Sequence, residues 1–352
     1  MGYTLCMCMH MLYSSAKDFA NYLLGSPFLL FIFTFVFSLM LVANFYYSKE
    51  FWQSCFPRGG SSAITGVFKF DYGLQYGPHN WKDMFPGATG SYQSPINIRT
   101  SDTSLLKISE RLVWNHYEDL PLKTVIENNG KTVVLRTNYE FNKPTIAGAD
   151  LLQSYIFDSA RFRWSFLDGE GSEHAIDNMK FPMELQATHI SRSSQSDMCS
   201  NMFGDIGILV ISYFFSITKY DNPYLDPITS NLHLIRHPGC KADIPPFPLS
   251  WLCYPFKTGF YSYGGSLSEP PCTEGVTWFV HPEPMAISIK QIIEFRSLLG
   301  SDNTSRIMRN FRPVQNVNGR VICYNRYDPL NCSSSPNDNC EEENDDEEDQ
   351  CF

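Results

Sequence analysis

The stretch Ile206-Gly207-Ile208-Leu209-Val210-Ile211-Ser212-Tyr213-Phe214-Phe215 is almost continuously apolar. A run of this length that is apolar on both faces predicts a central strand, buried on both sides of a sheet. Outward from it, the sequence Thr132-Val133-Val134-Leu135 predicts a second strand. Residues Ile289 to Leu299 predict a helix, with Ser288 as its N-cap and Gly300 just past its end. Short strand-like runs alternate with turn signals, so the residues alone predict a mainly β domain.

The chain has 352 residues, enough for one domain of about 250 residues with an extension at each end. Its formal net charge of −10 argues against nucleic acid as a partner. Much of this charge lies in the stretch Glu341-Glu342-Glu343-Asn344-Asp345-Asp346-Glu347-Glu348-Asp349, which predicts a solvated segment. We therefore interpret residues 328–352 as a cysteine-containing, acidic, disordered tail.

An uncharged apolar run at residues 27–45 is close to the length that spans a bilayer. We interpret residues 25–47 as a transmembrane signal anchor, and a cleaved signal peptide is the alternative. Residues 1–24 are then an N-terminal leader and residues 48–69 a linker. This hydrophobic segment is expected to be a helix that precedes the domain.

The orientation of that segment is predicted from two opposing signals. Lys17 precedes the apolar run whereas Lys49 and Arg58 follow it, a bias that by itself places the C-terminal side in the cytoplasm. The cysteines beyond the run and the glycosylation acceptors at Asn303 and Asn331 favour export instead. We expect a single-pass membrane protein with an extracellular C-terminal domain, or a secreted protein if the segment is cleaved.

Several blocks of sequence follow one another in an order that is known from one protein family. They are Tyr76-Gly77-Pro78-His79-Asn80-Trp81, Gln93-Ser94-Pro95-Ile96-Asn97-Ile98, Asn128-Asn129-Gly130, Gly171-Ser172-Glu173-His174, Gly265-Ser266-Leu267-Ser268-Glu269-Pro270-Pro271-Cys272, Val276-Thr277-Trp278 and Asn310-Phe311-Arg312-Pro313-Val314-Gln315. With these blocks the chain resembles the alpha-class carbonic anhydrases over residues 70–327. The resemblance implies a single α+β, mainly β domain, with a large twisted, mostly antiparallel central sheet and short peripheral helices.

The resemblance also implies that the metal site has been lost. The three histidines that bind zinc in the family correspond to Arg161, Arg163 and Gln186. A zinc enzyme of this design needs three neutral imidazoles and an open fourth position for water. A guanidinium group has no lone pair to offer and stays protonated. The chain is therefore similar to the acatalytic carbonic anhydrase-related proteins, and no zinc cofactor is expected.

Positions around the lost ligands are kept in part. Glu184 corresponds to the family's carboxylate that orients the third ligand, and Glu173 to its gatekeeper carboxylate. Ser268 corresponds to the hydroxyl that accepts from the zinc-bound water and donates to that gatekeeper. The proton-shuttle histidine corresponds to Lys131, whose ordinary pKa near 10 suits proton exchange at neutral pH poorly. Glu269 stands where the family has a neutral residue.

The two arginines lie two residues apart on a predicted strand and therefore point to the same face. Two buried cations are costly unless they are paired. The resemblance places Glu173, Glu184 and Glu269 near these arginines. We therefore expect an internal ion-pair network of Arg161 and Arg163 with acids such as Glu184 and Glu269, in which Glu269 compensates the added positive charge. The alternative is an anion site, in which a guanidinium group binds a carboxylate or a phosphate.

Two further residues carry expectations from the resemblance. His174 is interpreted as a core histidine that forms hydrogen bonds. The usual disulfide partner of Cys272 in exported members corresponds to Ala88, so Cys272 either pairs elsewhere or stays free. Cys199, Cys240 and Cys253 are its candidate partners.

Three functions are carried forward. The first is a non-enzymatic, membrane-anchored module that binds an unidentified extracellular protein. The second, implied by family membership alone, is a zinc-dependent carbonic anhydrase that catalyses the reversible hydration of CO2. The third is a binder of small anions through Arg161 and Arg163.

Overall fold

The computed structural model describes residues 69–108, 110–149, 151–191 and 207–327, and all structural statements concern these residues. They belong to one compact unit of the chain. The predicted leader, the apolar run at residues 27–45 and the acidic tail lie outside them, as do Asn331 and Cys199. Among the described residues, no helix is both long enough and apolar enough to cross a bilayer.

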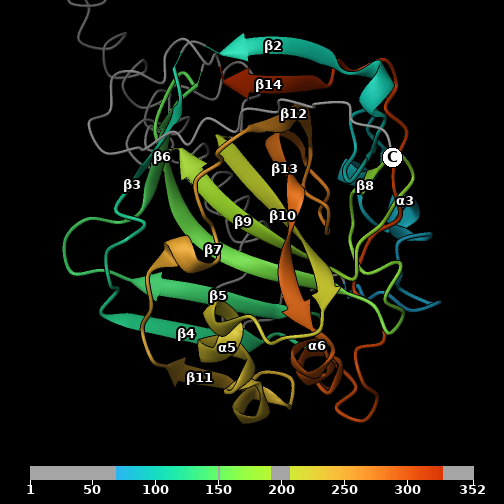
Figure 1. Ribbon diagram of the computed structural model, residues 1–352. Coiled ribbons are helices and arrows are strands. Elements are labelled where there is room, and N and C mark those ends of the chain that lie inside the picture. The colour runs from blue at the N-terminus through green and yellow to red at the C-terminus, as the bar shows by residue number, and fades with distance from the viewer. Residues whose placement is uncertain (1–68, 109, 150, 192–206, 328–352) are drawn as a thin grey trace, which may run out of the picture. The chain divides into compact units, whose positions relative to one another are not determined.

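A twisted sheet of twelve strands forms the centre of the domain (Figure 1). Ten of its strands form a continuous path, in the order β11 (Lys241–Ile244), β4 (Lys123–Asn128), β5 (Val133–Asn138), β7 (Tyr155–Trp164), β9 (Met183–Ser191), β10 (Ile208–Thr218), β13 (Glu274–Ser288), β12 (Gly259–Ser266), β14 (Cys323–Tyr327) and β2 (Ser104–Ile108). Off this path, β3 (Leu112–Asn115) pairs with β6 (Thr145–Gly148), which also pairs with β7. A small separate sheet joins β1 (Asn97–Ile98) to β8 (Ala175–Ile176).

The pairings of the large sheet are antiparallel except for β10 with β13 and β14 with β2. The predicted mainly β fold, with a large and mostly antiparallel sheet, is thus confirmed. The N-terminal hydrophobic helix of that prediction lies outside the described residues.

Strand β10 is the central strand that the apolar run predicts. Every residue from Ile208 to Phe215 is buried, and the strand lies between β9 and β13. The run is apolar on both faces because both faces of the sheet are covered here. The second predicted strand also forms, as β5, although it begins at Val133 rather than Thr132.

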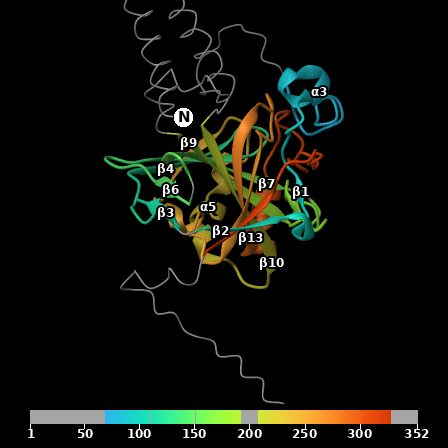
Figure 2. The ribbon, with the colours of Figure 1, turned by 90° about the horizontal axis from the view of Figure 1, so that it is seen from above.

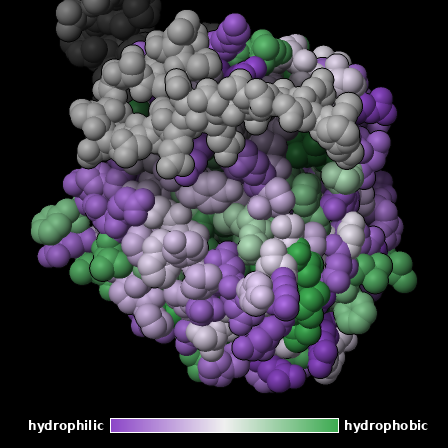
Figure 3. All heavy atoms as spheres, viewed as in Figure 1, coloured by the Kyte–Doolittle hydropathy of each residue, from purple (hydrophilic) through white to green (hydrophobic). Residues whose placement is uncertain are grey.

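The helices are short and lie around the sheet. They are α3 (Trp81–Met84), η1 (Pro86–Thr89), η2 (Thr100–Asp102), η4 (Pro223–Leu225), α5 (Asp226–Thr229), η5 (Leu232–Ile235), η6 (Leu249–Trp251) and α6 (Ile289–Arg296). Helix α3 lies at one side of the sheet, apart from α5, in both views of the ribbon (Figures 1 and 2). Over the lower part of the face drawn in Figure 3, hydrophilic side chains surround smaller groups of apolar ones.

Helix α6 shows where the sequence prediction was right and where it was wrong. Ser288 caps the helix as predicted, because its Oγ accepts from the backbone N–H of Gln291 and the Gln291 side chain accepts from the N–H of Ser288. The predicted end at Leu299 was wrong, since the helix stops at Arg296. Leu299 instead forms a β-bridge with Arg306, so a tertiary contact overrides the local helical pattern.

Candidate functional site

Neighbouring strands bring the predicted site residues onto one face of the sheet. Along the pairing of β7 with β9, Arg161 lies opposite Gln186 and Arg163 lies opposite Glu184. Between the two arginines, Phe162 points to the other face, where its ring lies 5.0 Å from that of Phe295 in α6. The alternation of a strand therefore separates a charged cluster on one face from an apolar core on the other.

Arg163 is the centre of this cluster, and its side chain is only 1% exposed. Its Nε donates to Gln186 Oε1 at 3.0 Å, Nη1 donates to Tyr72 Oη at 2.8 Å and Nη2 donates to Glu269 Oε2 at 3.1 Å. Glu173 Oε2 lies 3.6 Å from Nε. Burial by itself would lower the pKa of Arg163, but the neighbouring carboxylates outweigh it and raise the pKa.

Glu269 bridges the two arginines. Its Oε2 accepts a hydrogen bond from Arg163. Its Oε1 forms an ion pair with Arg161 Nε at 3.2 Å, but the geometry of this contact is not that of a hydrogen bond. The Arg161 side chain is 11% exposed, and its Nη1 donates to Ser159 Oγ at 3.1 Å. Burial raises the pKa of Glu269, but Arg163 and Arg161 more than offset this, so the carboxyl is held below its usual pKa.

Gln186 connects the arginine to the buried acids. Its Oε1 accepts from Arg163, while its Nε2 donates to Glu173 Oε2 at 2.6 Å and to Glu184 Oε1 at 3.0 Å. The amide dipole thus places its oxygen toward the cation and its N–H groups toward the anions. Ser268 Oγ lies at the far limit of a hydrogen bond, 3.5 Å from the same Gln186 oxygen.

Glu184 takes no part in an ion pair with either arginine, which corrects the expected network. Its carboxylate accepts from the backbone N–H groups of Glu173 and His174, from His174 Nδ1 at 2.9 Å and from Ser212 Oγ at 2.8 Å. Burial opposes ionisation, but the contact with His174 and the hydrogen bonds outweigh it and lower the pKa of Glu184 to about 2.

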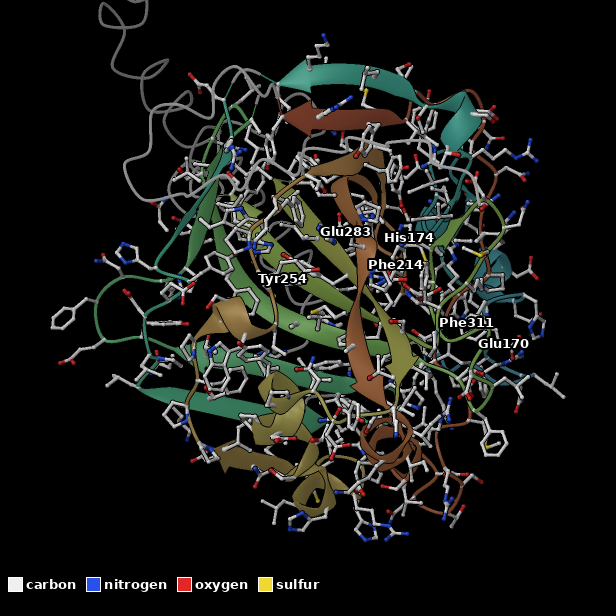
Figure 4. The ribbon with its side chains drawn as sticks, in the orientation of Figure 1. Glu170, His174, Phe214, Tyr254, Glu283 and Phe311 are labelled. Atoms are coloured by element: carbon white, nitrogen blue, oxygen red, sulfur yellow. The ribbon has the colours of Figure 1, made fainter. Side chains whose placement is uncertain are left out.

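His174 is fully buried and forms hydrogen bonds through both ring nitrogens, as expected of it. Its Nε2 lies 2.7 Å from Tyr263 Oη, and its Nδ1 contacts Glu184. In Figure 4, His174 lies to the right of β13. This histidine therefore fixes the orientation of Glu184.

Lys131 lies at the edge of the cluster. Its Nζ stands over the ring of Phe70, 4.5 Å from the centroid, and burial lowers its pKa. The predicted glycosylation acceptor Asn303 lies in an exposed turn, where its Oδ1 is 2.7 Å from His237 Nδ1.

Comparisons with known proteins identify the family of the domain. The family described as eukaryotic-type carbonic anhydrase matches residues 76–326. This chain belongs to that family. It is 33% identical to carbonic anhydrase 7 of Homo sapiens over 262 residues, which are 74% of this chain and 98% of the relative. It is 33% identical to carbonic anhydrase 7 of Mus musculus, with the same coverage, and 30% identical to carbonic anhydrase 1 of Monodelphis domestica, covering 72% of this chain and 96% of the relative.

A zinc ion, which the family implies, does not fit the side chains at positions 161, 163 and 186. The two guanidinium groups offer no lone pair, and the Gln186 oxygen already accepts from Arg163. Among the described residues, no group of three or more His, Cys, Asp or Glu side chains is placed to hold a metal ion.

Two members of the cluster were not singled out in the sequence. Tyr72 belongs to none of the family blocks, yet its hydroxyl oxygen accepts a hydrogen bond from Arg163 Nη1. Asn310 belongs to one of the family blocks, and its Oδ1 accepts from the backbone N–H of Trp164 at 2.7 Å. That block was the only sequence signal for Asn310, and there was none for Tyr72.

The cysteines of the described part are free thiols, namely Cys240, Cys253, Cys272 and Cys323. Cys272 is buried in the same small apolar cluster as Ala88, and burial raises the pKa of its thiol to about 12. A buried, protonated thiol of this kind is inert as a nucleophile.

Proposed function

We propose that this chain is a catalytically inactive member of the carbonic anhydrase family. The observation that carries the proposal is the buried guanidinium group of Arg163, bound by Gln186, Tyr72 and Glu269 at a position where the family resemblance expects a zinc ligand. Hydration of CO2 by this family depends on zinc to lower the pKa of bound water to about 7. A side chain without a lone pair cannot hold that metal.

The charge of the cluster also supports inactivity over an anion-binding role. Arg161 and Arg163 are balanced by Glu173 and Glu269, which lie in ion-pair distance of them. An incoming carboxylate or phosphate would have to displace Glu269 from both guanidinium groups. A small-anion site at these arginines is therefore the weaker proposal.

The role that remains for such a scaffold is binding through its surface. We infer an extracellular protein as the partner, with membrane attachment through residues 27–45, because the sequence carries an apolar run and two glycosylation acceptors. This step rests on analogy with folds that keep their architecture while losing their chemistry. Treatment of the cell-expressed protein with an N-glycosidase tests export, and an unchanged mobility would contradict it.

Elemental analysis and a CO2 hydration assay test the inactive state. The full chain is expected to contain no stoichiometric zinc and to show no hydration above the uncatalysed rate. The triple variant Arg161→His, Arg163→His, Gln186→His is expected to gain zinc, because Glu173, Glu184 and Ser268 still surround the site. A matched control, Arg99→His, Arg136→His, Gln315→His, adds three histidines outside the cluster and should gain none.

The proposal is wrong if the unmodified chain binds about one zinc per molecule and hydrates CO2. Zinc in the control variant as well as in the restored one would show adventitious binding and would remove the support from the restoration.

A further inference from the structure

A groove on the surface of the domain is lined by exposed aromatic side chains. This groove, of about 800 Å³, lies beside the end of β10, the short helices η4 and η6, and β13. Tyr220, Tyr224 and Trp251 line it with 74%, 52% and 37% of their surface exposed, and Tyr254 lines it as well. Exposed aromatic side chains that gather in one groove are typical of a binding surface.

Three of the four rings, those of Tyr224, Trp251 and Tyr254, pack against other aromatic rings before any ligand arrives. Trp251 stacks on Phe247, with centroids 5.9 Å apart and an interplanar angle of 20°, and its centroid lies 5.4 Å from that of Tyr224. Tyr254 Oη lies 3.3 Å from His281 Nδ1. Rings that are already ordered lose little conformational entropy on binding. Tyr254 lies to the left of β13 in Figure 4, and no residue that lines the groove belongs to the cluster around Arg161 and Arg163.

The charge of the groove selects a cationic ligand. Of its described lining residues, those that carry charge at neutral pH are Glu118 and Asp221. Asp221 is paired with Lys290 at 3.5 Å, whereas Glu118 makes no ion pair with a described residue and accepts from Ser250 Oγ at 2.8 Å. Lys219 lies over the ring of Tyr220, 5.3 Å from its centroid, so this ring already has a cation–π contact and Glu118 is the group that faces a ligand's cation.

The polar tips of the rings select an acceptor-rich ligand. No described residue accepts from Trp251 Nε1 or from the hydroxyl groups of Tyr220 and Tyr224. A polyproline II segment offers unpaired carbonyl oxygens to such donors and proline rings to the aromatic faces. An added β-strand fits less well, because the carbonyl of Ala286 in β13 already accepts from Asn222 Nδ2 at 2.9 Å.

We propose that this groove binds a proline-rich segment of a partner protein, in the polyproline II conformation, with an arginine or lysine directed at Glu118. The proposal rests on the binding role proposed above and names the chemistry of the partner. It does not depend on the state of the metal site.

Fluorescence anisotropy with the purified full chain tests the proposal. The probe is a labelled twelve-residue peptide with repeated Pro-x-x-Pro spacing and one terminal arginine. The comparison peptides replace that arginine by glutamate, or the prolines by glycine. We expect saturable binding of the first peptide, at least about fivefold tighter than of either comparison peptide.

Two variants locate the site. Tyr220→Ala removes an exposed ring and is expected to weaken binding about fivefold or more. Glu118→Gln is expected to reduce the preference for arginine over glutamate. The control Phe141→Ala removes a ring that is 85% exposed elsewhere on the domain and should leave binding unchanged. Circular dichroism confirms that each variant is folded.

The proposal is overturned if the proline peptide does not bind, if the glycine peptide binds equally well, or if Tyr220→Ala and Phe141→Ala behave alike. Saturable binding of cellohexaose in its place would identify a sugar site and also overturn it. The zinc content is measured on the same sample to distinguish the proposal on the groove from that on the inactive metal site. A chain that contains no zinc and does not bind the peptide refutes only the proposal on the groove.

Discussion

A single buried residue, Arg163, determines the character of the charged cluster. Removing a guanidinium group from water costs several kcal/mol, which only close carboxylates and hydrogen-bond acceptors can offset. Here Glu173 and Glu269 supply the charge, and Gln186 and Tyr72 supply neutral acceptors. The cluster is therefore balanced as a whole, and the loss of one acid leaves a buried cation without its partner.

Glu269→Gln is expected to destabilise the domain by about 2 kcal/mol, because both arginines lose a shared carboxylate and the site is only partly open to water. Urea denaturation measures this. The control is Asp102→Asn, which removes an exposed pair with Arg99 at 4.0 Å and should change stability by less than about 0.5 kcal/mol. Equal stability of Glu269→Gln and the unmodified chain would contradict the network.

His189 makes the stability depend on pH. Its Nε2 lies 2.6 Å from Tyr117 Oη, and burial lowers its pKa to about 4. The unfolded chain, with a histidine pKa near 6.5, binds the proton first as the pH falls. Stability is thus full above pH 6.5 and falls by about 3 kcal/mol as the pH decreases toward 4.

Denaturation curves between pH 7 and pH 5 check this expectation. His189→Phe removes the titrating group, so its stability should fall less steeply with decreasing pH, whatever its stability at pH 7. Glu184 adds little in this range, because its pKa of about 2 places its contribution between pH 4.5 and pH 2. An equally steep slope in the variant would assign the pH dependence to other groups.

At the scale of elements, the sequence predicts those parts that depend on neighbouring residues. The apolar run identifies β10, and Ser288 identifies the start of α6, because burial on both faces and capping are local patterns. The predicted end of α6 at Leu299 was wrong, because Leu299 forms a β-bridge with Arg306 instead of continuing the helix.

The site divides in the same way. The charge compensation by Glu269 could be predicted from the family resemblance, which places it near the two arginines, and the structure has both ion pairs. The bond from Arg163 to Tyr72 joins residues 91 apart in sequence, and no local pattern announces it. The resemblance placed Glu184 near the arginines, and its charge suggested an ion pair, but its oxygens accept from His174 and from backbone N–H groups instead.

The contact between η1 and the segment around Cys272 allows a test of an element pair. Ala88 and Cys272 are both fully buried in one cluster, and Gln93 Nε2 donates to Gly87 O at 2.9 Å and to Cys272 O at 3.2 Å. We expect Ala88→Cys to form a disulfide with Cys272 and to stabilise the domain by about 2 to 4 kcal/mol.

Thiol titration and thermal denaturation under oxidising conditions measure this. Ala88→Ser is the control, because it adds a polar atom of similar size that cannot crosslink. If both thiols of Ala88→Cys stay reactive in the oxidised, unfolded protein, the two segments are not placed as described.

At the scale of the whole chain, the net negative charge and the folded domain belong to different segments. Residues 328–352 contain ten acidic residues and no lysine or arginine, which equals the formal net charge of −10. The remainder of the chain is therefore formally neutral. The fold of the described domain depends instead on β14, which ends at Tyr327 and lies between β12 and β2.

Two truncations separate these contributions. Deletion of residues 328–352 should move the melting temperature by less than about 2 °C, because no described strand is lost. Deletion of residues 323–352 removes β14 and with it the bond from Asn325 Nδ2 to Ser262 Oγ at 2.7 Å, as well as the buried ring of Tyr327. Since β12 and β2 then have no strand between them, we expect a loss of more than about 3 kcal/mol, or about 6 to 12 °C. Similar melting temperatures for the two truncated chains would show that β14 does not hold β2 on the sheet.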